Sequence, residues 1–337
     1  MKAAYLKEKE NIIFKNIDKP EPGPNEVLVK VKSVGLCGSD MHYYKHGKIG
    51  DYVVEDPLIL GHESAGEVEK IGEKVEGLKK GDRVAIEPGV PCGKCDYCRT
   101  GKYNLCPDVI FMATPPIDGA FAEFVTSPPE YLFKLPENVS FEEGAMVEPL
   151  AVGMNAAKKA NIKLGDKVLI LGAGAIGLVT LQAVKAAGAA DITVTDLNEL
   201  RLGKAINTGA STVINVENEE IPEPETYDVV IETAGVKSTA QQALKLVKRG
   251  GRVVLVGLTP EGTFSFPVNQ ILDKELTVEG IFRYANLYQR AINLISSGMI
   301  DVDTLITDRF NFEDVDKAFV HADQNANKII KLVVNFD

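Results

Sequence analysis

The stretch Lys167-Val168-Leu169-Ile170-Leu171-Gly172-Ala173-Gly174-Ala175-Ile176-Gly177 decides the fold of this 337-residue chain. Its first five residues form a short, nearly continuous apolar run, which is typical of a parallel strand that is covered on both faces. Three glycines in a GxGxxG pattern follow, and a helical pattern then continues through Val184. A strand before and a helix after such glycines is the arrangement that holds a dinucleotide pyrophosphate at a helix N-terminus. The stretch therefore predicts a dinucleotide-binding fold.

An acidic residue follows at the distance that such a fold requires. Asp191–Thr195 is predicted to be the next strand, and it leads into Asp196, nineteen residues beyond Gly177. A carboxylate at this position accepts hydrogen bonds from the adenosine ribose and repels a 2′-phosphate, so we expect NAD rather than NADP. Arg201 lies close enough in sequence to soften this preference, or it is a solvated helix residue. The candidate cofactor-binding residues are Gly172, Gly174, Ile176, Gly177, Asp196 and Arg201.

Strand and helix patterns continue to alternate along the chain. Apolar runs at 227–232, 251–256 and 276–280 predict strands, and helical patterns lie near 240–247 and 287–296. Such alternation predicts a doubly wound parallel sheet, here a Rossmann domain over residues 151–282 of an α/β protein. The remaining segment, 283–337, is short for a domain, and we expect it to return to the N-terminal one.

The first 150 residues have a different character. Short alternating runs separated by Gly and Pro predict a β-rich, barrel-like domain. The chain is also longer than one hydrophobic core usually serves, which favours two domains. Hydrophobic residues make up 45% and charged residues 25%, values typical of an ordinary folded enzyme.

Charge and cysteine content narrow the partners and the compartment. The net charge of −11 argues against nucleic acid, which needs clustered Lys and Arg. No apolar stretch approaches the ~18 residues of a membrane span, so we expect no membrane insertion and a cytoplasmic location. The chain has five cysteines, and four of them lie within fifteen residues, which suits metal binding better than a disulfide framework.

That cysteine cluster predicts a structural zinc site in a lobe at about residues 88–108. Two short spacers let neighbouring thiolates face one ion, and a longer loop brings the fourth. Four sulfur ligands leave no position for water, so such a site is structural. The alternatives are two disulfides or four idle thiols, but a disulfide between cysteines three apart would constrain little. The predicted ligands are Cys92, Cys95, Cys98 and Cys106.

A second group of metal-binding residue types is spread over the N-terminal domain. Cys37, His62, Glu63 and Glu148 supply the thiolate, imidazole and carboxylate of a zinc site that keeps one position open. His62 and Glu63 are adjacent, and adjacent residues of a strand point to opposite faces, so this argument favours Glu148 as the ligand. Ser39 and His42 are placed to pass a proton to solvent. Their alternative roles are a helix N-cap for Ser39 and a plain surface residue for His42.

These motifs together resemble the zinc-dependent medium-chain dehydrogenases, and most closely the sorbitol (polyol) dehydrogenases. The resemblance runs from end to end and is carried by Gly61-His62-Glu63, the four-cysteine lobe, Cys37-Gly38-Ser39-Asp40 with His42-Tyr43-Tyr44, the run Phe141-Glu142-Glu143-Gly144-Ala145 leading to Glu148-Pro149-Leu150, and Gly280-Ile281-Phe282-Arg283-Tyr284. It implies a GroES-like catalytic domain and Cys37, His62 and Glu63 as ligands of a catalytic zinc, with Glu148 a fourth ligand or a holder of the zinc-bound water. The strand geometry thus favours Glu148 as the zinc ligand, whereas the resemblance implies Glu63.

The resemblance also implies the activity, namely oxidation of a polyol at a secondary carbon, with two zinc ions per chain, NAD and a homotetramer. A polar and aromatic pocket suits such a substrate, because buried polar groups reject molecules that lack hydroxyls. The candidate substrate residues are Tyr44, Phe111, Arg283 and Tyr284, with an interdomain salt bridge as the alternative for Arg283. A threonine or butanediol dehydrogenase is the enzyme alternative. The remote alternative is a protein that binds a dinucleotide without catalysing a reaction. Such a protein is expected to have lost one of the zinc ligands.

Overall fold

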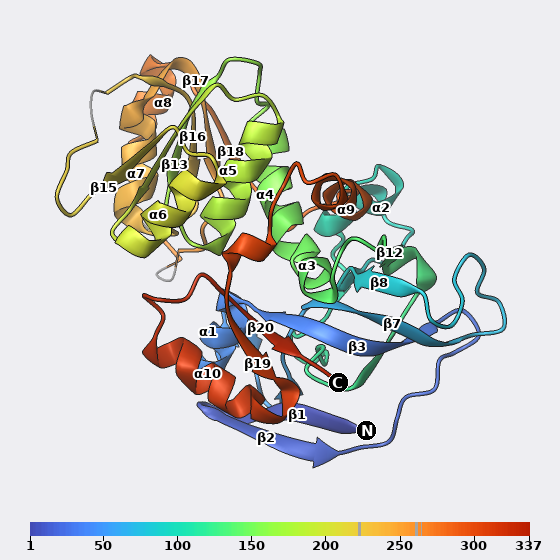
Figure 1. Ribbon diagram of the computed structural model, residues 1–337. Coiled ribbons are helices and arrows are strands. Elements are labelled where there is room, and N and C mark those ends of the chain that lie inside the picture. Colours follow the sequence, from blue (N-terminus) through green and yellow to red (C-terminus); the bar gives the residue numbers. More distant parts are fainter. Residues whose placement is uncertain (222–223, 260–261, 264) are drawn as a thin grey trace. The chain divides into compact units, whose positions relative to one another are not determined.

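The computed structural model describes residues 1–221, 224–259, 262–263 and 265–337, and these residues divide into two compact units. The first unit comprises residues 1–148, 288–297 and 302–337, and the second comprises residues 149–287 and 298–301. Figure 1 colours the chain from blue to red, and red C-terminal strands are part of the blue N-terminal unit.

The first unit is built mainly of antiparallel strands. Among the described residues its main sheet has the order β12-β8-β7-β3-β20-β19, with β11 also paired to β3. The last strand of the chain joins this sheet, because Leu332 lies opposite Leu36. The strands are β3 (Val27–Leu36), β7 (Glu63–Ile71), β8 (Arg83–Ile86), β11 (Phe124–Ser127), β12 (Leu132–Lys134), β19 (Ile306–Asn311) and β20 (Lys331–Asn335).

A smaller sheet and several short elements complete this unit. A three-stranded sheet has the order β2-β1-β6 in the described part of the chain. Its strands are β1 (Lys2–Glu8), β2 (Asn11–Asn16) and β6 (Leu58–Ile59). Two short pairs are β4 (Lys48–Ile49) with β5 (Tyr52–Val53) and β9 (Gly89–Val90) with β10 (Ile110–Phe111). The helices are α1 (Gly38–His46), α2 (Asp96–Arg99), α3 (Phe141–Ala145), α9 (Tyr288–Ser296) and α10 (Val315–Gln324).

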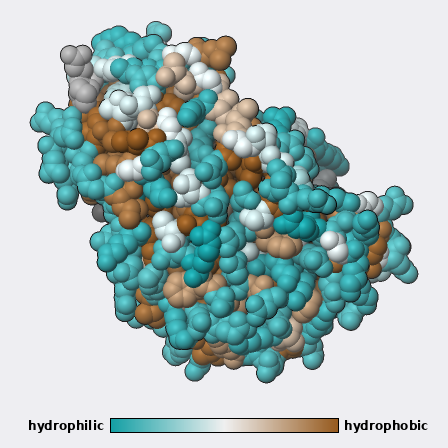
Figure 2. Space-filling model, in the orientation of Figure 1, coloured by the Kyte–Doolittle hydropathy of each residue, from teal (hydrophilic) through white to brown (hydrophobic). Residues whose placement is uncertain are grey.

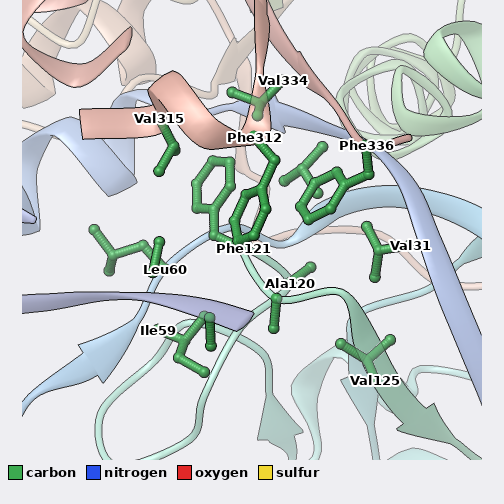
Figure 3. Packing of buried hydrophobic residues seen from close by; sticks show 14 of the residues in the cluster. Val31, Ile59, Leu60, Ala120, Phe121, Val125, Phe312, Val315, Val334 and Phe336 are labelled. Carbon is green, nitrogen blue, oxygen red and sulfur yellow. The ribbon is translucent and has the colours of Figure 1, made fainter. Parts of the chain in front are cut away.

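The core of the first unit joins residues from both ends of the chain. Phe312 and Phe336 stack with ring centroids 4.2 Å apart, and Phe121 and Val31 belong to the same buried cluster (Figure 3). Burying one such aromatic side chain is worth about 1.5–3 kcal/mol. The C-terminal segment is thus held by hydrophobic burial as well as by strand pairing.

The second unit has the predicted doubly wound architecture. A parallel sheet of six strands is described, in the order β15-β14-β13-β16-β17-β18. The strands are β13 (Lys167–Leu171), β14 (Asp191–Asp196), β15 (Thr212–Asn215), β16 (Tyr227–Glu232), β17 (Val247–Leu255) and β18 (Thr277–Gly280). The helices are α4 (Val147–Lys159), whose first two residues belong to the first unit, α5 (Ala175–Ala186), α6 (Glu199–Thr208), α7 (Lys237–Leu246) and α8 (Val268–Asp273). The Rossmann prediction is confirmed.

Some large hydrophobic side chains of this unit reach the surface, which Figure 2 shows as brown areas among teal. Leu197 is 59% exposed directly after β14, and Leu258 is 77% exposed shortly after β17. Ligands of doubly wound sheets bind outside the carboxyl ends of the strands. These side chains therefore lie at the end of the sheet where a cofactor is expected. No helix in the described ranges is long and apolar enough to cross a membrane.

Candidate active site

Cys37, His62 and Glu63 converge in the first unit. One ligand atom from each side chain lies within 4.8 Å of the others. Cys37 lies between the end of β3 and the start of α1, and Glu63 is the first residue of β7, so His62 precedes the strand. The rule that adjacent strand residues face opposite ways therefore does not apply to His62 and Glu63. Gly61 makes the irregular backbone possible with its φ of 88°.

Asp40 organises this group from the first turn of α1. One carboxylate oxygen accepts the backbone N–H of Cys37 at 3.0 Å, and the other accepts that of Gly61 at 3.0 Å. The second oxygen also lies 3.7 Å from Nδ1 of His62. Burial lowers the pKa of His62, but the nearby charges of Asp40 and Cys37 outweigh this effect and hold that pKa well above its usual range. Such clustered negative charge favours a cation at this place.

Lys331 of β20 holds Glu63. Its Nζ lies 2.7 Å from each carboxylate oxygen and 3.3 Å from the carbonyl oxygen of Leu36, and both partners of the ion pair are buried. The strands β7 and β20 lie on either side of β3, so the pair spans β3 at Gly35. A Cβ atom at Gly35 would lie 2.2 Å from a carboxylate oxygen of Glu63. Glycine at this position therefore leaves the room that the carboxylate occupies.

Glu148 lies in the first turn of α4, where it is buried. It does not belong to the convergent group of three, although its charge helps to raise the pKa of Lys331 against the lowering effect of burial. Glu87, which follows β8, is also buried and accepts the hydroxyl of Tyr103 at 2.8 Å. Burial raises the pKa of Glu87 to about 7, and the charge of Glu148 adds to the increase. The structure thus brings Glu63 to Cys37 and His62, and it places Glu148 within electrostatic range.

The predicted proton-transfer residues lie on α1. Cys37 occupies the N-cap position, so Ser39 is not the N-cap that its alternative role required. His42 lies one turn further, with its ring centroid 4.6 Å from that of His46. Burial and the charge of His46 lower the pKa of His42. This lowering favours the neutral imidazole, which is the form that a proton acceptor requires.

Two predicted substrate residues of this unit differ in their surroundings. The ring centroid of Phe111 lies 5.8 Å from that of His62, beside the convergent group. Tyr44 is instead a core residue: its ring packs on Phe319 with centroids 5.1 Å apart, and its hydroxyl donates to the carbonyl oxygen of Glu10 at 3.2 Å. The prediction that Tyr44 contacts substrate is therefore not supported, because these contacts occupy its side chain.

The four-cysteine lobe presents four sulfur atoms to one point. Cys92, Cys95, Cys98 and Cys106 each place Sγ within 4.8 Å of the others, and all five cysteines of the chain are free. The distance between the sulfurs of Cys95 and Cys98 is 3.3 Å, and that between the sulfurs of Cys92 and Cys98 is 3.9 Å. A tetrahedral zinc with ~2.3 Å bonds spaces its sulfurs ~3.8 Å apart. The disulfide alternative is therefore not observed.

Electrostatics in the lobe also fit a cation. Backbone N–H groups of Lys94 and Cys95 lower the pKa of Cys92 to about 6. Desolvation and hydrogen bonds with Cys95 and Cys106 raise the pKa of Cys98 to about 12. Four thiolates this close together repel one another unless a cation compensates their charge. The donor set and spacing therefore fit a structural zinc, just as thiolate, imidazole and carboxylate fit a catalytic zinc with an open position.

The glycine-rich loop of the second unit has the geometry of a pyrophosphate site. Gly174 is the N-cap of α5, and a Cβ atom at Gly177 would lie 2.0 Å from the carbonyl oxygen of Gly172. Asp196 at the end of β14 accepts the N–H of Ala173 at 2.7 Å, so its carboxylate is fixed beside the loop. Ile176 lies in the first turn of α5, and its side chain is partly exposed. The cofactor role of these residues stays a prediction.

The other predicted residues of the second unit have distinct local roles. Arg201 lies in the first turn of α6 and is partly exposed. The guanidinium of Arg283 lies 4.7 Å from the ring centroid of Phe282, and its backbone carbonyl accepts Nδ2 of Asn155 at 2.7 Å. Arg283 also has a φ of 53°, which is uncommon for a residue with a side chain. Tyr284 is buried.

Two residues that contact the convergent group, Asp40 and Lys331, were not predicted from the sequence. Asp40 belongs to the motif Cys37-Gly38-Ser39-Asp40, but no role was predicted for it. It lies three residues after Cys37, which is the position from which a carboxylate reaches the N-cap backbone. Lys331 interrupts the apolar run from Ile329 to Val334. A lone Lys in a strand that is otherwise buried is itself a signal, because a buried charge requires a partner.

Comparison with known proteins agrees with this geometry. Residues 23–137 match the family model "Alcohol dehydrogenase GroES-like domain", and residues 175–297 match "Zinc-binding dehydrogenase". The chain is 44% identical to sorbitol dehydrogenase of Bacillus subtilis, over 99% of this chain and 97% of the relative. It is 46% identical to sorbitol dehydrogenase of Bos taurus, over 91% of this chain and 88% of the relative.

Solved structures share the whole fold. An Escherichia coli oxidoreductase/dehydrogenase of unknown specificity, described as involved in membrane biogenesis, superposes with a TM-score of 0.95 at 43% identity, covering 100% of this chain and 99% of that one. A Sinorhizobium meliloti protein bound to NADP gives 0.92 at 33% identity, with 99% and 98% covered. The 2R,3R-butanediol dehydrogenase of Bacillus subtilis gives 0.90 at 34% identity, with 99% of both chains covered. The chain therefore belongs to the zinc-dependent medium-chain dehydrogenases, in the sorbitol dehydrogenase branch.

Proposed function

We propose that this protein oxidises a polyol of the sorbitol or xylitol type at a secondary carbon, giving the ketose and transferring hydride to NAD+. The observation that supports this most directly is the convergence of Cys37, His62 and Glu63, in a chain that also has a dinucleotide-binding unit. The remote alternative of a protein without turnover loses its basis, because the predicted ligands Cys37, His62, Glu63 and Glu148 are all present.

The chemistry follows from the residues of the site. Cys37, His62 and Glu63 would hold a zinc ion, which would supply a Lewis acid that lowers the pKa of the substrate hydroxyl toward neutrality. Ser39 and His42 conduct the proton that this hydroxyl releases, and the lowered pKa of His42 favours the neutral imidazole, which has a lone pair free to accept it. Glu148 orients the reacting hydroxyl of the substrate, or the water molecule that this hydroxyl displaces. A dinucleotide held by the glycine-rich loop and Asp196 would supply the nicotinamide ring that accepts the hydride of the carbinol carbon.

The resemblance assigns substrate selection to Phe111 of the first unit and to Arg283 and Tyr284 of the second. Phe111 forms an apolar wall beside His62. Arg283 and Tyr284 bind hydroxyl groups further along the polyol, and such remote contacts orient the substrate as well as bind it. A short secondary alcohol makes none of those contacts. This difference separates a polyol dehydrogenase from a threonine or butanediol dehydrogenase.

The cofactor and assembly proposals are finer. Two zinc ions per chain are supported by the two convergent donor sets. NAD rather than NADP is supported by the carboxylate of Asp196, fixed beside the glycine-rich loop, although one structural relative binds NADP. Free cysteines suit a reducing compartment, which supports the cytoplasm. We keep a homotetramer as the assembly implied by the resemblance, with no nucleic-acid or membrane partner.

The experiment is a substrate screen of the purified, zinc-loaded protein. NADH formation is followed with sorbitol, xylitol, galactitol, 2,3-butanediol, L-threonine and 2-propanol, each also with NADP+. We expect the highest kcat/KM for a five- or six-carbon polyol with NAD+. A higher value for butanediol or threonine would contradict the proposed substrate class, and no turnover with any alcohol would contradict the proposed activity.

A further inference from the structure

The helix that bears the predicted proton acceptor also bears a second histidine in contact with it. His42 and His46 lie four residues apart on α1, the spacing that places two side chains on the same face of a helix. Their ring centroids are 4.6 Å apart with an interplanar angle of 60°. The two imidazole rings therefore lie next to each other on one face of α1.

The surroundings leave these rings open to a ligand. His46 is exposed and His42 is partly exposed. Within the described part of the chain neither ring takes part in an ion pair, whereas the other two histidines do: His62 lies 3.7 Å from Asp40, and His321 lies 2.9 Å from Asp308. The charge of one imidazolium also disfavours protonation of the other, as the lowered pKa of His42 reflects. Imidazole nitrogens are among the ligands that zinc and related ions prefer in proteins.

We propose that His42 and His46 form a third metal site, which binds a divalent ion such as Zn²⁺ in exchange with solvent and thereby inhibits the enzyme. Two imidazole ligands leave the remaining coordination positions to water, so the site is weaker than the two convergent sites. An ion on the ring nitrogen of His42 occupies the lone pair that would accept the substrate proton. The inhibitory part of this proposal rests on the proposed function, whereas the binding part does not.

The test uses the zinc-loaded protein, dialysed free of excess metal and then equilibrated with increasing Zn²⁺. Wild type is expected to take up one further zinc per chain, and His46→Ala is expected to lose it. Loss of an outer-shell partner alone costs about 10–100-fold in metal affinity, so loss of a ligand should weaken binding at least tenfold. His321→Ala is the matched control, because it removes a histidine that is already paired with Asp308, and it should bind the third zinc normally.

Activity is measured in parallel as NADH formation with a polyol. Added Zn²⁺ should inhibit wild type and His321→Ala reversibly on dialysis, and His46→Ala should keep its activity at the same concentration. Absence of a third zinc in wild type, or equal uptake by His46→Ala, would overturn the site. Equal inhibition of a His46→Ala protein that has lost the third zinc would overturn the inhibitory role. If the protein oxidises no alcohol, the proposed function fails, and dialysis still decides whether the site exists.

Discussion

Lys331 and Glu63 form a buried ion pair across β3, with the ammonium nitrogen 2.7 Å from both carboxylate oxygens. Glu63 is also one of the three residues that converge on the proposed catalytic zinc. One carboxylate therefore faces two cations, and Lys331 sets where that carboxylate lies when zinc is absent. Removal of one partner of a buried pair leaves the other charge uncompensated.

We therefore predict that Lys331→Met destabilises the metal-free protein by about 3–5 kcal/mol. The loss should be smaller in the zinc-loaded protein, because zinc then compensates Glu63. Urea denaturation with and without zinc measures both values. Lys328→Met, which removes an exposed lysine from the same segment, is the control and should change little. An equal loss with and without zinc would mean that Glu63 does not face the metal.

Glu87 gives a pH prediction. Burial raises its pKa from 4.5 to about 7, so the folded state retains a proton that the unfolded state releases first. Stability from this group is full below pH 4.5 and falls as pH rises to 7. Glu87→Gln removes this pH dependence. The free energy of unfolding of the variant relative to wild type should therefore increase between pH 5 and pH 8, by at most about 3 kcal/mol. Urea midpoints of both proteins at both pH values measure this change. An equal difference between variant and wild type at the two pH values would contradict the prediction. Glu130→Gln, at an exposed position, is the control.

The two metal sites should separate by mutation. Cys95→Ser should remove one zinc and lower the Tm, with turnover retained by whatever protein remains folded. Cys37→Ser should remove the other zinc and abolish turnover, with a smaller change in Tm, because the lobe cysteines hold a whole loop together. Elemental analysis, calorimetry and activity of the two variants form a matched comparison. Loss of both zinc ions in either variant would contradict independent sites.

The cofactor preference should depend on the charge of Asp196. Asp196→Asn keeps an oxygen that can accept the N–H of Ala173 but removes the repulsion of a 2′-phosphate. We expect the kcat/KM ratio of NAD+ to NADP+ to fall by about tenfold or more, since about 1.4 kcal/mol of lost discrimination is tenfold. Asp196→Ala also removes the loop contact and should weaken both cofactors. An unchanged ratio in Asp196→Asn would show that the carboxylate is not at the ribose.

Much of the fold was readable because its signals are local. The strand at 167–171, its glycines and Asp196 are close in sequence. Together with the strand–helix alternation that follows, they predicted the Rossmann unit, which is confirmed. The predicted start of the strand at 251–256 was wrong, because β17 begins at Val247, before the pair Gly250-Gly251. A Gly-Gly sequence normally marks a turn, and here pairing with β16 overrides that preference.

The sequence predicted which types of residue form the site, but it did not predict how those residues are arranged in space. The choice between Glu63 and Glu148 depended on where β7 begins, and strand ends are set by pairing with β3 and β8 rather than by local pattern. Tyr44 was assigned to substrate because it adjoins the motif, whereas the orientation of α1 turns its ring to Phe319. Lys331 is 268 residues from Glu63, and no local pattern indicates a pair at that separation.

Isotope transfer tests the central claim most directly. Sorbitol labelled with deuterium at C2 is incubated with the zinc-loaded protein and NAD+, and both products are analysed by mass spectrometry. The account predicts that the deuterium appears in NADH, that the sugar product is a ketose, and that Cys37→Ser forms neither. Deuterium that remains in the sugar, or an aldose as the product, would contradict oxidation at the secondary carbon.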